Sequence, residues 1–224
     1  MKKTIWLKEE ITIAKELLAL APKLTEEFLN YHDDFISGDF RNGRPYRNDV
    51  FDTTNVQSRT TAWKIDGLKY THLSANIFKN HFQDTQIRER FPTAVALTEK
   101  WGNDCPISTY SILEKNAVIT RHTGIENRDN EFLRIHIPLL IPNGDIFFEV
   151  EGVEIDWNDL FGFDNQCAHS AHNLSPHRRL VYLIDIRRDS LGIPNGDKWS
   201  RHREHTTPPF VRGALPKIYH TNQL

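Results

Sequence analysis

Two histidines in separate segments, His122 and His169, are candidate metal ligands. The first lies in "VITRHTGIEN" at the end of an expected strand, and the second lies in "CAHSAHN" after another expected strand. Non-haem Fe(II) oxygenases bind iron through two histidines and one carboxylate, which leaves further positions open for co-substrate and oxygen. The carboxylate usually stands two residues after the first histidine, where this chain has Gly124. The sequence therefore offers two imidazoles without the usual acid.

Other residues compete for these roles. His172 lies three residues after His169, and on an extended segment the two side chains point to opposite faces. We favour His169 as the second ligand and expect His172 near the surface. Glu126 and Asp129 could supply the missing carboxylate, but their spacing from the first histidine does not fit the motif.

Basic residues inside expected strands indicate a buried anion site. In "LRIHIPLLI", Arg134 and His136 share one face, opposite the face formed by the apolar residues. In "RRLVYLIDIRR", Arg179 shares a face with Val181 and Leu183. An interior arginine needs a fixed anionic partner because an unpaired buried charge is very costly. That partner is either a carboxylate of the protein or a ligand.

The first third of the chain has a helical pattern. The spacing of the apolar residues from Ile11 to Ala21 predicts a helix that Pro22 ends, followed by a short second helix. Residues 34–62 are predicted to be loop. "FPTAVALTEKWG" predicts a further helix, with Pro92 in its first turn and Gly102 just past its end.

From about residue 108 the apolar period changes from helical to two. The pattern predicts several short strands with no helix between them, including a hairpin that turns near Glu151 and Gly152. Such a series is typical of a sandwich, a jelly roll or a small barrel. Beyond Ser190 we expect a loop over the core, in which His202 and His205 are solvated.

Composition limits the classes of function. A net charge of -2 gives no electrostatic reason to expect a nucleic acid or an acidic membrane as partner. We see no apolar run long enough to span a bilayer and no secretory signal. Cys105 and Cys167 match no metal or redox motif, and we expect two packed free thiols in a cytoplasmic protein.

A longer pattern combines these motifs. The stretch "YSILEKNAVITRHTGIENRDNEFLRIHIPLLIP", followed later by "FGFDNQCAHSAHNLSPHRRLVYLIDIRRD", resembles the aspartyl/asparaginyl β-hydroxylase family of Fe(II)/2-oxoglutarate-dependent oxygenases. The resemblance covers residues 108–189 and extends weakly through "RTTAWKIDGLKY" and "RFPTAV". It implies a mainly β fold, a double-stranded β-helix (a cupin-like jelly roll) with N-terminal helices. We expect one oxygenase domain over residues 1–224, with the core at 108–189, a helical and mixed part at 1–107 and a tail at 190–224.

The resemblance also implies a metal centre. His122 and His169 would bind Fe(II), with water where the acid usually stands. Asp164 would orient a ligand or the iron-bound water. This chain departs from some members at this centre. Members that act on epidermal-growth-factor-like domains have a second acid after the Phe-Asp pair, where this chain has Asn165.

The co-substrate site follows from the same resemblance. Ser111 and Arg179 would hold the distal carboxylate of 2-oxoglutarate, since a planar guanidinium matches a planar acid. Arg134 and His136 would line the space around its other carboxylate and the substrate's acidic group. Members that act on epidermal-growth-factor-like domains tend to carry another arginine where this chain has Phe132. This difference weakens the case for an aspartyl residue of a protein as substrate.

We therefore expect an enzyme that uses Fe(II), 2-oxoglutarate and O₂ to hydroxylate a C–H bond. The expected substrate is a carboxylate-bearing small molecule, an amino acid or a peptide, or an aspartyl/asparaginyl residue. The alternatives are a non-enzymatic cupin-like protein that binds a metal or an anion, and a family member that has lost iron because Gly124 offers no acid. The oligomeric state stays open.

Overall fold

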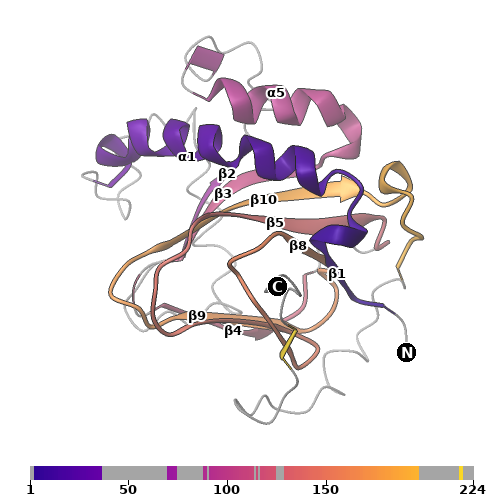
Figure 1. Ribbon diagram of the computed structural model, residues 1–224. Coiled ribbons are helices and arrows are strands. Elements are labelled where there is room, and N and C mark those ends of the chain that lie inside the picture. The colour runs from indigo at the N-terminus through magenta and orange to yellow at the C-terminus, as the bar shows by residue number, and fades with distance from the viewer. Residues whose placement is uncertain are drawn as a thin grey trace, which may run out of the picture.

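The protein forms two facing β-sheets with helices over one of them (Figure 1). The computed structural model describes residues 3–36, 70–74, 88–89, 91–113, 115, 117–124, 129–196 and 217–218. Sheet A has the order β1-β8-β5-β10-β3-β2, and sheet B has the order β11-β7-β6-β9-β4. This arrangement confirms the predicted jelly roll with N-terminal helices. No helix in the described ranges combines the length and the apolar character that a membrane crossing requires.

All strand pairs in sheet A are antiparallel. Its strands are β1 (Ile5–Leu7), β8 (Phe161–Phe163), β5 (Phe132–Leu140), β10 (Arg179–Arg187), β3 (Ile107–Leu113) and β2 (Tyr70–Ser74). Strands β5 and β10 form the centre of the sheet, and both have nine residues. The two strands contributed by the N-terminal part, β1 and β2, lie at its edges.

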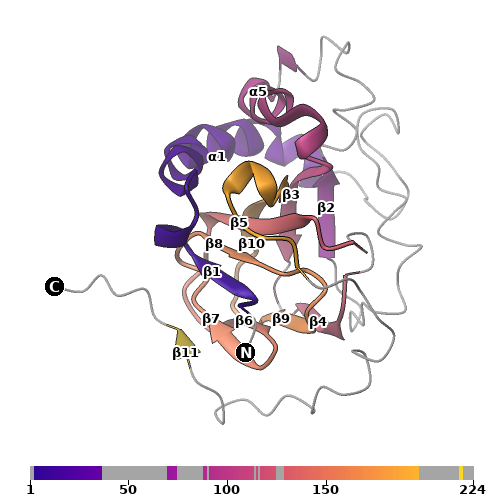
Figure 2. The ribbon, with the colours of Figure 1, turned by 90° about the vertical axis from the view of Figure 1, so that its right-hand side faces the viewer.

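Sheet B lies on the far side of sheet A from the helices. Its strands are β4 (Ala117–His122), β9 (His169–Asn173), β6 (Ile146–Val150), β7 (Val153–Ile155) and β11 (Lys217–Ile218). β6 and β7 form the predicted hairpin, with Glu151 and Gly152 at φ 50° and 79°, as a two-residue turn with positive φ requires. β11 adds to β7 in parallel, as Figure 2 shows. Of the loop predicted at 34–62, residues 34–36 belong instead to helix α1 (Ala14–Ile36). The rest of that segment and the tail histidines lie outside the described residues.

Helix α1 (Ala14–Ile36) differs from the prediction, because it continues through Pro22. The proline removes one helical hydrogen bond, and two helices were expected for that reason. Its ring lies on the exposed side of the helix, whereas Leu17, Leu24 and Phe28 are buried on the side that meets sheet A. Tertiary packing on both sides of the proline therefore outweighs the local cost.

Helix α5 (Pro92–Trp101) begins and ends as predicted, with Gly102 at φ 51° after its last turn. No side chain of its own caps its first turn. The Glu27 carboxylate of α1 accepts hydrogen bonds from the amides of Thr93 (2.6 Å) and Ala94 (3.3 Å) instead. A carboxylate at a helix N-terminus satisfies free N–H groups and the helix dipole, so this contact holds the two helices together. The described residues also form short 3-10 turns at Lys8–Glu10, Gly102–Asp104 and Asp189–Leu191.

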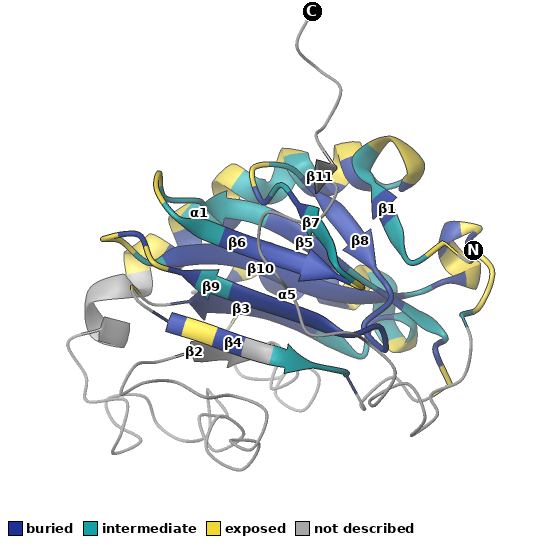
Figure 3. Ribbon diagram, turned by 90° about the horizontal axis from the view of Figure 1, so that it is seen from below, coloured by how far each residue is buried: buried dark blue, intermediate teal, exposed yellow. Residues whose placement is uncertain are grey.

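Two apolar cores result from the alternation of side chains along the strands. Leu133, Ile135 and Ile137 of β5 pack under the helices, in a core that also holds Tyr110 and Tyr182. The second core lies between the sheets and includes Phe148, Phe161, Phe163 and Val181. Figure 3 shows the resulting burial along the strands of both sheets. The site described below lies on the side of sheet A that faces this second core.

Candidate active site

His122 and His169 lie directly opposite each other on the antiparallel strands β4 and β9. Their ring centroids are 4.2 Å apart, with an angle of 56° between the ring planes. The His169 ring also contacts Phe163 and Phe148, at centroid distances of 5.1 and 6.2 Å, so it points into the core between the sheets. His169 is only 6% exposed. The two imidazoles are thus close enough to share one ion, given metal–nitrogen bonds of about 2.0–2.1 Å.

A β-bulge brings His122 to this place. The register of β4 against β9 shifts between Ile119 and His122. Without the extra residue, Arg121 would stand opposite His169, and its guanidinium instead lies 3.4 Å from the buried Glu149 carboxylate. Bulges next to active sites often re-aim a side chain in this way.

A hydrogen bond determines which ring nitrogen of His169 is free of a proton and can bind a metal. Its Nδ1 lies 2.8 Å from the backbone oxygen of Cys167. A carbonyl oxygen only accepts, so Nδ1 carries the proton and Nε2 keeps a lone pair. This pattern is common for metal-binding histidines, in which a backbone carbonyl sets the tautomer.

His172 lies on the other face of β9. Its Nε2 is 3.0 Å from an oxygen of Asp145, and its ring stacks on Phe147 at 4.9 Å. Because His172 lies three residues after His169 on the same strand, the two side chains point to opposite faces, as expected. Among the other candidates, Asp129 is exposed and Glu126 lies outside the described residues.

Asn165 fills the space beside Gly124. The Gly124 amide donates to the Asn165 backbone oxygen at 2.8 Å. A Cβ atom added at Gly124 would lie 1.8 Å from Nδ2 of Asn165, so no side chain fits at position 124 while this amide is in place. In the described part of the chain, no group of three His, Cys, Asp or Glu side chains is arranged to hold a metal.

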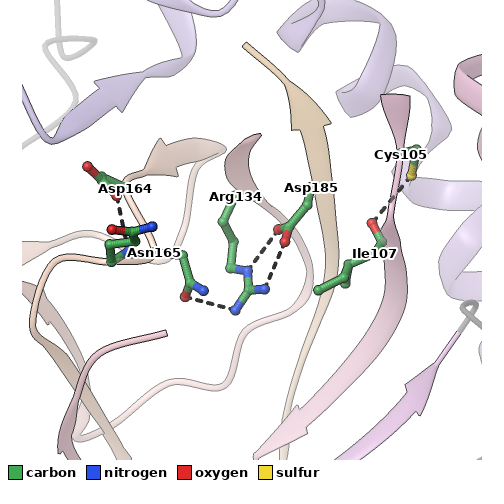
Figure 4. Close-up of polar contacts among 7 residues, drawn as sticks. Cys105, Ile107, Arg134, Asp164, Asn165 and Asp185 are labelled. Atoms are coloured by element: carbon green, nitrogen blue, oxygen red, sulfur yellow. Dashed lines mark hydrogen bonds and ion pairs between the residues drawn. The ribbon is translucent and has the colours of Figure 1, made fainter. Parts of the chain in front are cut away.

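Arg134 orients the Asn165 amide and is itself held by Asp185 (Figure 4). Its Nη1 donates to Oδ1 of Asn165 at 2.8 Å, and its Nε and Nη2 donate to the two Asp185 oxygens, each at 2.8 Å. This bidentate pair occupies the fork of the guanidinium. That Arg134 lines the space around an acidic group of the substrate or co-substrate stays a prediction, with three of its five N–H donors already bound to Asp185 and Asn165.

Asp164 lies in a different network from the one expected. Its carboxylate accepts from Nδ2 of Asn130 at 2.6 Å and from the backbone amide of Gln166 at 3.0 Å, and it lies 3.8 Å from Nη2 of Arg188. Burial lowers the pKa of the Arg188 guanidinium, and the Asp164 charge opposes this shift. These contacts stabilise the turn that carries Asn165. That Asp164 also orients a ligand or the iron-bound water stays a prediction.

Arg179 and Ser111 face the same interior space on neighbouring strands. Val181 pairs with Ser111 and Arg179 pairs with Leu113, so Arg179 and Ser111 are diagonal neighbours on one face. Arg179 is 1% exposed, and its guanidinium lies 4.2 Å from the centre of the Trp157 ring. Its Nε and Nη1 atoms are buried and make no hydrogen bond within the described residues. These donors fit a carboxylate.

Trp157 connects this arginine to His136. The indole nitrogen donates to Nδ1 of His136 at 3.2 Å. Because the indole N–H is only a donor, a neutral His136 carries its own proton on Nε2 and can donate from there. His136 is enclosed by Phe148, Phe161 and Phe163, with centroid distances of 5.1 to 5.3 Å.

A family model for aspartyl/asparaginyl β-hydroxylase matches residues 10–189 of the 224. The chain belongs to this family. The match confirms the resemblance and makes this protein a member of a family of Fe(II)- and 2-oxoglutarate-dependent hydroxylases. No curated protein matches the chain by sequence.

Solved structures show partial similarity at low identity. A predicted oxalate decarboxylase from Thermotoga maritima is 20% identical, with a TM-score of 0.32, over 40% of this chain and 73% of that one. A 2OG-Fe(II) oxygenase family oxidoreductase from Burkholderia pseudomallei is 10% identical, with a TM-score of 0.31, over 52% and 59%. AviO1 from Streptomyces viridochromogenes is 12% identical, with a TM-score of 0.38, over 83% and 90%.

Sequence reasoning missed Trp157 and Asp185 in this member of the β-hydroxylase family. Asp185 shares the alternating face of Arg179, Val181 and Leu183 on β10, and this signal could have identified it. Trp157 follows β7, outside the regular strands, and no spacing rule points to it.

Replacing Trp157 with phenylalanine should weaken 2-oxoglutarate binding while leaving metal binding intact. The change keeps the aromatic bulk but removes the donor to His136 and reduces the ring contact with Arg179. A lost neutral hydrogen bond is worth about 0.5–1.5 kcal/mol, and therefore only a few-fold to roughly tenfold in affinity. Calorimetric titration of the metal-loaded variant with 2-oxoglutarate measures this effect, and unchanged affinity would contradict it.

Proposed function

We propose that this chain hydroxylates a C–H bond of a carboxylate-bearing small molecule or amino acid, with Fe(II), 2-oxoglutarate and O₂. The observation that carries the proposal is the opposed pair of imidazoles, 4.2 Å apart at paired strand positions. The buried guanidinium of Arg179 supports it, because a cation deep in an apolar core fits a fixed anion.

In this proposal each residue has a defined task. His169 offers Nε2 to the metal because its Nδ1 proton is bound to the Cys167 carbonyl, and His122 offers the second imidazole. Arg179 and Ser111 hold the distal carboxylate of 2-oxoglutarate, and Nε2–H of His136 donates to its other end. The bound metal and co-substrate supply the oxidation of the C–H bond. The phenylalanines around His136 keep water away from this space.

The surroundings of Arg134 support the proposed substrate class. Asp185 already neutralises this arginine, and Phe132 replaces the further arginine found in members that act on epidermal-growth-factor-like domains. Both features favour a free small substrate over an aspartyl residue of a folded protein. Its acidic group is then bound by donors other than the Arg134 fork.

Anaerobic Fe(II) titration in the presence of 2-oxoglutarate tests the proposal. The protein should develop the weak visible charge-transfer band of a chelated 2-oxoacid, and admission of O₂ should release succinate. Succinate release, screened against amino acids and small acidic peptides, then identifies the substrate class. A barrel that only binds anions would give neither the band nor succinate, and this result would reject the enzyme assignment.

A further inference from the structure

Among the described residues, no carboxylate joins the two histidines to hold a metal, so this part of the chain supplies one negative charge fewer than the usual site. In the usual site the protein supplies a carboxylate beside the two histidines. Here Gly124 has no side chain, and the neutral amide of Asn165 stands in its place. The carboxylates on either side of Asn165 in its hydrogen-bonded network are each paired with an arginine, Asp185 with Arg134 at 2.8 Å and Asp164 with Arg188 at 3.8 Å.

The orientation of the Asn165 amide is determined by its neighbour. A guanidinium only donates, so the atom that faces Nη1 of Arg134 must be the carbonyl oxygen. The NH₂ group therefore points the other way, to the place that a side chain at Gly124 would occupy. Asn165 is 1% exposed, and its Nδ2 has no hydrogen-bond partner among the described residues. A buried donor without a partner carries the cost of its lost hydration, which a bound acceptor would recover.

We propose that the third protein-side position of the metal is a site for a small monoanion, held by the Nδ2 donor of Asn165. The inference rests on the proposed function, because it requires a metal at His122 and His169. A monoanion restores the charge that the missing carboxylate would carry, and it accepts the hydrogen bond that Asn165 offers. Neutral water would satisfy the hydrogen bond but not the charge. The anion is either free in solution or a carboxylate of the substrate, and both have the same chemistry at this position.

Cobalt(II) absorption tests the inference without measuring turnover. The full chain is loaded with Co(II) and 2-oxoglutarate, and its visible spectrum is titrated with chloride and, separately, with formate at constant ionic strength. In the wild type each anion should change the spectrum in a saturable way. Asn165→Asp keeps the shape and the oxygen that faces Arg134 but puts a negative charge where the anion would bind. It should therefore bind either anion at least tenfold more weakly, and it should bind Co(II) at least as tightly as the wild type does. His172→Ala, on the opposite face of β9, should titrate as the wild type does.

Two further variants test whether the Asn165 side chain occupies the space that a carboxylate at position 124 would need. Gly124→Asp alone should lose Co(II), because the new side chain meets Asn165. Gly124→Asp combined with Asn165→Ala should bind Co(II) and no longer respond to chloride. A wild-type spectrum that neither anion alters, or an Asn165→Asp variant that binds anions equally well, would overturn the inference while leaving the proposed function intact. A wild type that binds no Co(II) would instead reject both.

Discussion

His169→Ala should abolish metal binding and succinate formation. The variant leaves His122 as the one imidazole at the site, and the described residues supply no acid to replace the lost ligand. Loss of a direct ligand should cost more than the roughly 10–100-fold in metal affinity that loss of an outer hydrogen-bond partner costs. Anaerobic Fe(II) or Co(II) titration and a succinate assay measure the two effects.

His172→Ala is the matched control for this variant. Its imidazole lies on the opposite face of the same strand, bound to Asp145 and stacked on Phe147. The His172→Ala variant should retain most of the metal affinity and most of the succinate formation, with at most a small loss of stability. If His172→Ala were inactive and His169→Ala active, the ligand assignment on β9 would have to be reversed.

Arg179→Ala should strongly raise the concentration of 2-oxoglutarate that the protein needs for half-saturation. Truncation of one partner of a buried, hydrogen-bonded ion pair costs about 2–5 kcal/mol. This loss corresponds to roughly 30-fold or more in the dissociation constant of 2-oxoglutarate. Titration of the anaerobic Fe(II) complex with 2-oxoglutarate, followed by the visible band, measures the shift.

Two controls separate binding from stability. Arg179→Lys keeps the charge but not the planar fork, so it should fall between the wild type and the alanine variant. Arg178→Ala removes the neighbouring, half-buried arginine and should leave the requirement unchanged. A loss of thermal stability in Arg179→Ala at an unchanged 2-oxoglutarate requirement would reduce Arg179 to a packing partner of Trp157.

The strand and turn pattern after residue 108 was predictable because each strand alternates its side chains locally. β5, β10 and the β6–β7 hairpin all follow from this period, and α5 follows from its terminal Pro92 and Gly102. The continuation of helix α1 through Pro22 was not predictable in the same way. Whether a helix continues through a proline depends on what the flanking turns pack against, which local sequence does not contain.

The details of the site depend on contacts between distant segments. The bulge that turns His122 toward His169 arises from the pairing of β4 with β9. The pairing of Arg134 with Asp185 requires β5 and β10 to be neighbours, and sequence spacing alone does not show this. The resemblance indicated which residues gather at the site, whereas the register between strands determines which partner each residue has.

Strand β4 lies at the edge of sheet B and is hydrogen-bonded to β9 alone among the described strands. One of the two imidazoles stands on this strand, and the other stands on its sole neighbour. An ion held by both rings would cross-link the edge strand β4 to the inner strand β9. Because a ligand that binds only the closed form opposes opening, occupancy of the site and detachment of this edge strand would be coupled in a single equilibrium.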